Sequence, residues 1–227
     1  MTVCDIPPLR TAKDLINAVN SLGVLPFFKN NVPGFSVAEH TPGEIWFVEG
    51  VEGPWEWKGE TVRAGLMYAK LFRGKAVWVS RGLVPHLLNW RRDGYDYDSL
   101  YDEGLLPAAE KHIMDVLTAE GPLLSTQLKE LSGYGKNGKK GFDGLITRLQ
   151  MRGYAAVSDF EYALDKHGAP YGWGVARYAA PEQIFGAGYV RSAYSVPPAE
   201  SKQIIVDQLQ KILPQTGADA ILRLIRE

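Results

Sequence analysis

Residues 107–122 read PAAEKHIMDVLTAEGP and residues 139–154 read KKGFDGLITRLQMRGY, and these two stretches decide the fold. In the first, apolar residues recur with the spacing of one helix face until Gly121-Pro122 ends the pattern. The second has the same spacing at Phe142, Leu145, Ile146 and Leu149. Gly153 follows it in the position of a C-capping residue. Both stretches therefore predict amphipathic helices, the second running from Lys139 to Arg152.

A further short helix and a hairpin are predicted around these two helices. Ser125 is a suitable N-cap for a helix with Leu128 and Leu131 inward, which the turn at 133–135 ends. Residues 154–164 and 171–178 are rich in β-formers and are separated by the turn-forming residues 165–170. Three helices followed by a hairpin is the order of a winged helix-turn-helix.

The chain outside this core predicts a mixed α+β protein. Periodicity and turn residues indicate helices at 11–21, 61–72 and 84–91, strands at 44–49 and 76–80, and helices near 199–212 and 218–225. We therefore expect an N-terminal α/β region at 1–104, a winged-helix domain at 105–186, and a C-terminal helical segment at 187–227 that packs on the body.

The outward face of the predicted 139–152 helix carries polar and basic residues. A helix that is apolar inside and cationic outside suits the major groove of DNA, where Lys and Arg meet phosphates. The turn of the hairpin would bring a further lysine to the DNA backbone. The predicted DNA-binding residues are Lys136, Lys139, Lys140, Arg148, Arg152 and Lys166 at phosphates, Thr147 near base edges, and Arg91 and Arg92 as additional phosphate contacts.

Overall charge neither requires nor excludes a polyanionic partner. The net charge is -1, but charges of one sign are grouped along the sequence. Residues 39–56 carry only acidic charges, 58–92 mostly basic charges, and 93–103 only acidic charges. Such segregation is the pattern expected of one positive face with acidic flanks. The alternative is that these charges interleave in space and neutralise one another.

Several short motifs resemble one family of DNA-repair proteins. They are Glu120-Gly121-Pro122-Leu123, Arg152-Gly153-Tyr154, Tyr178-Ala179-Ala180-Pro181 and, upstream, Val77-Trp78, Val84-Pro85 and Asn89-Trp90-Arg91-Arg92. In this order they resemble the winged-helix superfamily of AlkZ-type (YcaQ-like) DNA glycosylases over about residues 60–215. The stretches 57–60 and 72–75 resemble a shorter, AlkZ-related branch. The resemblance implies a winged-helix fold and a duplex or damaged DNA partner.

One element of the family pattern is missing. The glycosylases carry a Gln-x-Asp or Gln-x-Gln motif after the first helices, which positions a water molecule, whereas residues 22–28 here read LGVLPFF. Apolar side chains cannot orient a hydrolytic water molecule or stabilise a cationic sugar. The sequence therefore predicts a DNA-binding protein that is not catalytic. Two alternatives stay open: a glycosylase whose carboxylate has moved to Glu39, Glu49 or Glu52, and a protein-interaction module on the same scaffold.

No other chemistry is indicated. The single cysteine, Cys4, and four scattered histidines do not provide a metal site, and no nucleotide-binding loop is present, so we expect neither a metal nor a cofactor. No apolar run reaches the length of a membrane span, and we expect a cytoplasmic protein. Trp55 is the aromatic residue that could stack on an unpaired base.

Overall fold

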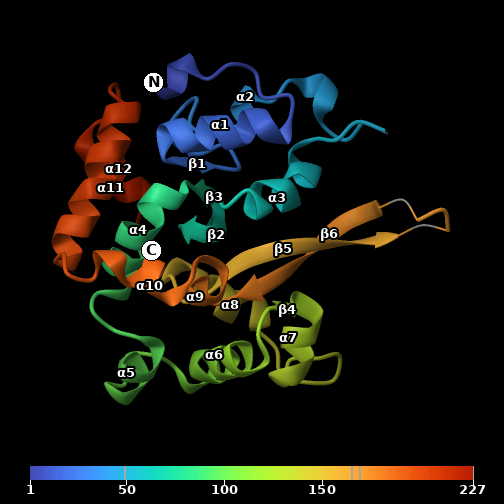
Figure 1. Cartoon of the computed structure of the whole chain (residues 1–227), viewed down its shortest axis with the longest axis vertical. Helices are drawn as coiled ribbons and strands as arrows, with labels where there is room; N and C mark the ends of the chain where they lie inside the picture. Colours follow the sequence, from blue (N-terminus) through green and yellow to red (C-terminus); the bar gives the residue numbers. More distant parts are fainter. Residues whose placement is uncertain (49, 165, 169, 227) are drawn as a thin grey trace.

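The computed structural model describes residues 1–48, 50–164, 166–168 and 170–226, with side chains described for all of these except 170–173. Across this part of the chain, six strands form one antiparallel sheet in the order β1-β3-β2-β5-β6-β4, with helices around it (Figure 1). The strands are β1 (Val24–Pro26), β2 (Met67–Phe72), β3 (Lys75–Val79), β4 (Leu123–Leu124), β5 (Ala156–Leu164) and β6 (Pro170–Ala179). The mixed α+β class is confirmed.

The helices lie around the sheet (Figure 1), and along the chain they alternate irregularly with the strands. They are α1 (Ala12–Leu22), α2 (Val37–His40), α3 (Pro54–Arg63), α4 (Val84–Arg92), α5 (Tyr97–Asp102), α6 (Ala108–Glu120), α7 (Ser125–Leu131), α8 (Phe142–Met151), α9 (Pro181–Phe185), α10 (Ala187–Val190), α11 (Pro198–Ile212) and α12 (Ala218–Leu224). Short 3-10 helices lie at η1 (Val3–Asp5), η2 (Gly43–Ile45), η3 (Arg81–Leu83) and η4 (Arg191–Ala193).

The first helix forms where its capping residues predict it. Thr11 is the N-cap of α1, and its side chain accepts a hydrogen bond from the backbone N–H of Asp14 at 3.2 Å. The Asp14 carboxylate accepts a hydrogen bond in return from the Thr11 N–H at 3.0 Å. This reciprocal pair satisfies N–H groups that the first turn of a helix leaves open. Gly23 ends the helix at a φ of 88°.

Two predictions for the N-terminal region were wrong. The expected strand at 44–49 is the 3-10 helix η2 followed by a turn, while Glu49 lies outside the described residues. The expected helix at 61–72 is the end of α3 followed by β2. Gly65, at a φ of 92°, stops the helix. Met67–Phe72 then lies between β3 and β5, buried on both faces, so its apolar residues carry no strand alternation.

The central segment has the predicted three helices and hairpin, and in addition the short strand β4, which was not predicted. Helix α7 begins at Ser125, with Leu124 in the N-cap position expected for Ser125. Helices α6, α7 and α8 are followed by the hairpin of β5 and β6, and β4 pairs with β6. The apolar face of α8 is buried as predicted, but α8 begins at Phe142 rather than Lys139. Leu131, expected to face inward, is 54% exposed. The β5–β6 hairpin extends away from the helices as a long ribbon (Figure 1).

One sheet joins the N-terminal and central parts of the chain. Tyr68 of β2 pairs with Val157 of β5, so the sheet continues across the boundary expected at residue 104. Trp78 of β3 is fully buried in the core, stacks on Phe27 at 5.1 Å, and donates a hydrogen bond to Thr61 Oγ1 at 2.8 Å. The division into 1–104, 105–186 and 187–227 stays a prediction.

Helix α11 packs against α4, and α12 packs against α11. The residues at helical spacing on α11, Ile205, Leu209 and Ile212, are buried as expected. Asn89 of α4 donates hydrogen bonds to the carbonyl oxygens of Ala193 and Val196 at 3.0 and 2.8 Å. Buried amide hydrogen bonds of this kind fix the return of the chain after β6.

Candidate nucleic-acid interface

Three predicted contact residues lie together on one exposed loop. Lys136, Lys139 and Lys140 are in the segment 132–141 that joins α7 to α8, and all three are exposed. The loop is compact, because Lys139 N–H donates to the Gly133 carbonyl at 2.8 Å and Gly138 N–H to Gly135 at 2.9 Å. The lysines therefore precede α8 instead of standing on its outer face.

The outer face of α8 is partly used inside the protein. Thr147 Oγ1 donates to the Asp143 carbonyl at 2.6 Å and accepts a hydrogen bond from Lys70 Nζ at 3.3 Å. Arg148 Nε donates to Glu110 Oε1 at 2.5 Å. Glu110 is fully buried, and its Oε2 has no hydrogen-bond partner among the described residues. Arg148 is thus the counter-charge of a buried carboxylate.

The last two residues of this predicted surface lie apart from the lysine loop. Arg152 is half-buried and donates through Nη1 to the Leu105 carbonyl at 3.1 Å. Lys166 is exposed in the turn of the β5–β6 hairpin, between Asp165 and Ala169, which lie outside the described residues. Figure 1 shows that this turn is at the far end of the hairpin.

The expected exposure of Arg91 and Arg92 was wrong. Both are buried on α4. Arg91 Nη2 donates to the carbonyl oxygens of Leu71 and Ile225 at 3.1 and 2.7 Å. Arg92 donates twice to the Gly153 carbonyl, at 3.1 and 2.8 Å, and pairs with Glu182. Guanidinium groups with these partners link separate elements of the fold and do not face solvent.

The pairing of Arg92 with Glu182 shifts the pKa values of both groups. Burial of Arg92 lowers the pKa of its guanidinium, but the hydrogen bond and charge of Glu182 outweigh this and raise it overall. Burial raises the pKa of the Glu182 carboxyl, and the hydrogen bond and charge of Arg92 outweigh this and lower it overall. Each charge therefore stabilises the other.

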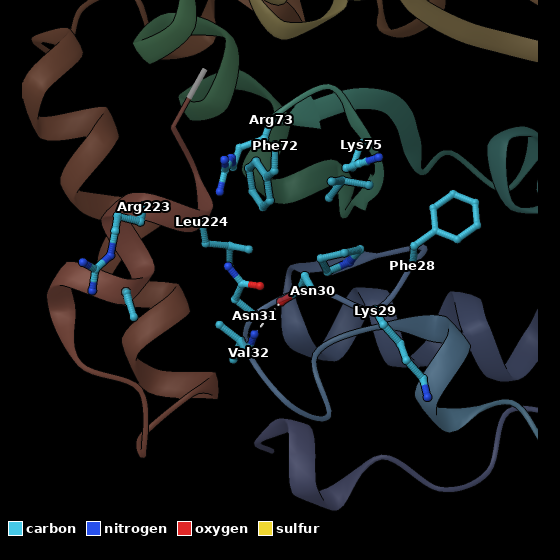
Figure 2. Close-up of a pocket in the computed structure, with 13 residues that line it drawn as sticks. Phe28, Lys29, Asn30, Asn31, Val32, Phe72, Arg73, Lys75, Arg223 and Leu224 are labelled. Atoms are coloured by element: carbon cyan, nitrogen blue, oxygen red, sulfur yellow. Dashed lines mark hydrogen bonds between the residues drawn. The ribbon is translucent and has the colours of Figure 1, made fainter.

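A cavity of about 590 Å³ lies on another part of the surface. Three segments form its walls: residues 26–32, which begin at the last residue of β1, the β2–β3 hairpin, and α12 (Figure 2). Among the described residues its lining contains four basic side chains and no acidic one; the basic residues are Lys29, Arg73, Lys75 and Arg223. In the view of Figure 2, Phe28, Lys29 and Lys75 lie toward one end and Arg223 toward the other, with Arg73 between them.

The β2–β3 turn at this cavity has an unusual backbone. Arg73 has a φ of 51° and is followed by Gly74 at 70°. Two successive positive φ values make a hairpin turn in which Asn, Asp or Gly is the usual first residue. The Arg73 N–H donates to the Arg226 carbonyl at 3.2 Å, which ties the turn to the end of the chain. The buried Arg91 also links β2 to the end of the chain, through its hydrogen bonds to the carbonyl oxygens of Leu71 and Ile225.

The sequence prediction did not identify this cavity. Its basic residues come from positions 29, 73, 75 and 223, which no local spacing connects. The basic run from 58 to 92 and the Arg73-Gly74 pair within a hairpin were the available signals. Trp55, expected as a possible stacking residue, is half-buried and contacts Phe27 at 4.8 Å and Phe28 at 5.8 Å. Phe28 is the member of this aromatic group that lines the cavity.

Lys58 is a buried cation on α3. Its ammonium lies 4.7 Å from the centre of the Trp55 ring and 4.4 Å from that of Phe160. Burial lowers the pKa of Lys58 to about 8, with Glu56 opposing the shift. This lysine was part of the basic run that predicted a positive face. It is instead enclosed by aromatic rings, where cation–π attraction offsets part of the loss of hydration.

Of the three carboxylates considered as replacement catalytic groups, Glu39 has a structural role, Glu52 is exposed, and Glu49 lies outside the described residues. Glu39 accepts hydrogen bonds from Gly34 N–H at 2.9 Å and from Ser36 Oγ at 2.5 Å, so both of its oxygens stabilise the start of α2. Within the described ranges, no three His, Cys, Asp or Glu side chains gather as a metal site requires. The described part of the chain also contains no helix with the length and apolarity to cross a membrane.

Comparison with known families places the chain. A family model described as "AlkZ related" matches residues 9–226, and the chain belongs to this family. Comparison with curated proteins and with solved structures finds no match.

Proposed function

We propose that this member of the AlkZ-related family binds duplex or distorted DNA, with residues 108–179 acting as a winged helix. The observation that carries the proposal is the exposed lysine loop, Lys136, Lys139 and Lys140, directly before α8. Lys166 at the end of the projecting β5–β6 hairpin supplies a second basic contact. The order of helix, short strand, two helices and hairpin, with β4 paired to β6, supports the winged-helix assignment.

The main proposed DNA contacts are the four lysines, Lys136, Lys139, Lys140 and Lys166. Their ammonium groups meet phosphates, which determine affinity more than sequence preference. Thr147, Arg148 and Arg152 stand at the edge of the proposed surface, because each already has a protein partner. Arg91 and Arg92 are left out because they are buried.

We propose further that the protein does not release bases. The stretch that replaces the glycosylase motif runs from Leu22 to Phe28 and includes the buried strand β1. Leu22, Leu25 and Phe27 are fully buried in the core. Such side chains provide neither a general base nor a counter-charge for an oxocarbenium ion, a contribution of about 10² to 10⁴ in rate for acid–base help alone. Incubation with alkylated DNA should therefore yield no abasic sites above background, and release of bases would overturn this part of the proposal.

Salt titration of duplex binding tests the main proposal. Four phosphate contacts, each releasing about 0.9 counterion, predict a slope of about -3 to -4 for log affinity against log salt. Replacing Lys136, Lys139 and Lys140 together by Ala should reduce that slope by about 3 and weaken binding. The matched control replaces Lys13, Lys202 and Lys211, which are exposed on α1 and α11. A flat salt response, or an equal loss in the control, would contradict the proposal.

A further inference from the structure

We propose that the cavity between residues 26–32, the β2–β3 hairpin and α12 binds one nucleoside phosphate, with the basic residues that line it attracting the phosphate and Phe28 against the base. The proposal does not depend on duplex binding by the lysine loop, because different residues carry it. Its ligand is a free mononucleotide or one nucleotide unit of a strand, and both present the same phosphate and base.

The electrostatics of the cavity favour an anion. Lys29, Arg73, Lys75 and Arg223 line it, and no acidic side chain does so among the described residues. The charged ends of these basic side chains point in different directions in Figure 2, so they act on an anion through the sum of their fields across the cavity. Several other cations are neutralised locally, as Arg63 is by Asp159 at 2.6 Å and Lys129 by Asp143 at 3.0 Å. The cavity cations differ from these in lining a hollow together.

The backbone at Arg73 supports a binding role for its side chain. A φ of 51° is unfavourable for a residue with a Cβ, and Gly or Asn would adopt it more easily. Strained positions persist where the surrounding structure enforces them, and they are found most often at binding and active sites. Here the turn is held by Gly74 and by the hydrogen bond of the Arg73 N–H to Arg226. The structure thus keeps an arginine at a place where its backbone is disfavoured, on the cavity wall.

Phe28 supplies a surface for a base. It is 41% exposed, although the residue before it is fully buried. The Phe28 ring contacts Phe27 at 4.5 Å and Trp55 at 5.8 Å between ring centres, so its position is fixed from behind by the aromatic core. An exposed ring beside cations is the arrangement that stacks on a base while the phosphate is held.

The remaining walls fit a sugar and a base edge. Phe72, Val77 and Leu224 give the cavity an apolar side. Asn30 holds the 26–32 wall in shape, because its Nδ2 donates to the Phe35 carbonyl at 2.7 Å and its Oδ1 accepts from Val32 N–H at 2.9 Å. Asn31 is exposed at the cavity, and its amide can donate and accept hydrogen bonds at a base. A volume of about 590 Å³ lies within the usual range for small-ligand sites.

Calorimetric titration of the full chain tests this proposal with three probes: deoxyadenosine monophosphate, deoxyadenosine and inorganic phosphate. We expect the nucleotide to bind about tenfold or more tightly than either part alone, because phosphate and base are held together. Equal binding of phosphate and nucleotide would remove the base contact, and equal binding of nucleoside and nucleotide would remove the phosphate contact. Absence of nucleotide binding at millimolar concentration, together with absence of binding by a 5′-phosphorylated oligonucleotide, would overturn the proposal.

Two variants separate loss of the site from loss of the fold. Arg73→Asn removes the charge and also suits the positive φ, so we expect a melting temperature equal to or above that of the unmodified protein and a loss of nucleotide affinity of about tenfold. Lys75→Ala should lower affinity without affecting melting. Lys211→Ala, an exposed lysine on α11 outside the cavity, is the matched control. Unchanged nucleotide affinity in the Arg73→Asn, Lys75→Ala double variant would contradict the assignment.

The source of the ligand and the two proposals are distinguished in the same series. Tighter binding of the phosphorylated oligonucleotide than of the mononucleotide identifies a strand, and equal or weaker binding identifies a free nucleotide. The Lys136, Lys139, Lys140 triple variant should keep mononucleotide affinity. The cavity double variant should keep the salt-dependent slope of duplex binding. Failure of one proposal therefore leaves the other testable.

Discussion

The β2–β3 turn and helix α4 belong to the same basic run of the sequence and use their cations in opposite ways. Arg73 and Lys75 are exposed at the turn and line a cavity. Arg91 and Arg92, at the end of α4, are buried and hydrogen-bonded to distant segments. In the sequence, the turn and the end of α4 each carry two basic residues. The difference teaches that a basic run predicts a basic surface only where no other element packs over it.

Arginine can serve in both environments because of its geometry. Its planar guanidinium carries five donors and stays charged when buried, so it can join several carbonyl groups at once. Arg92 does this between α4, Gly153 and Glu182. A lysine has no comparable fork. The one buried lysine described in the basic run, Lys58, sits between aromatic rings and has a lowered pKa.

The largest effect is expected on the buried side of the comparison. Arg92→Ala leaves Glu182 half-buried without its counter-charge and leaves the Gly153 carbonyl unsatisfied, which should lower the free energy of unfolding by about 3 kcal/mol or more. Denaturant unfolding measures this value. Because the pKa of Glu182 is lowered in the folded protein, the unmodified protein should also lose stability as the pH falls through the carboxyl's range, and the variant should lose less. The control is Lys211→Ala, an exposed lysine on α11, which should change stability by less than about 0.5 kcal/mol.

Replacing Arg148 tests whether this arginine of α8 stabilises the fold or is available to bind DNA. Arg148→Ala should lower the free energy of unfolding by about 1–3 kcal/mol, because the fully buried Glu110 would lose the hydrogen bond and counter-charge that Arg148 provides. Adding Glu110→Gln in the same chain should restore part of that loss, and a double-mutant cycle measures the coupling. If Arg148→Ala alone leaves stability unchanged, the arginine is available for DNA and belongs with the lysine loop.

Lys58 gives a smaller effect with a distinct pH dependence. Its pKa is about 8 in the folded protein against 10.5 for the unshifted group, so the unfolded chain holds more protons between these values. Stability should therefore rise from about pH 8 to pH 10, and Lys58→Met should abolish that rise while adding about 1 kcal/mol below pH 8. Urea unfolding at several pH values measures both. The cation–π contacts with Trp55 and Phe160 limit the gain.

The smallest stability effect is expected at the exposed turn. Lys75→Ala removes an exposed side chain with no hydrogen bond among the described residues, so melting should change by an amount corresponding to less than about 0.5 kcal/mol. A clear destabilisation would show that the turn cations, like those of α4, hold the fold together. That result would remove the contrast between the two regions.

Local patterns predicted the elements whose residues contact their near neighbours. The Thr11 cap, the face of α8 with Leu145 and Leu149, and the β5–β6 hairpin follow from spacing and turn residues. The prediction of a helix at 61–72 failed because β2 is buried on both faces. Such a strand has no alternation of apolar and polar residues to distinguish it from a helix. The exposure of Lys136, Lys139 and Lys140 could be predicted because they are close in sequence, although Lys139 and Lys140 were expected on the helix and not on the loop before it.

By itself, the sequence determined the mixed class, the order of the three helices and the hairpin in 108–179, and the family to which the chain belongs. The tertiary structure alone decided which cations face solvent. The partners of Arg92 and Arg148 lie 90 and 38 residues away in the chain, and the cavity combines residues from positions 29 to 223. Burial is a property of what packs over a side chain, and segments this distant leave no periodic signal at the site they cover.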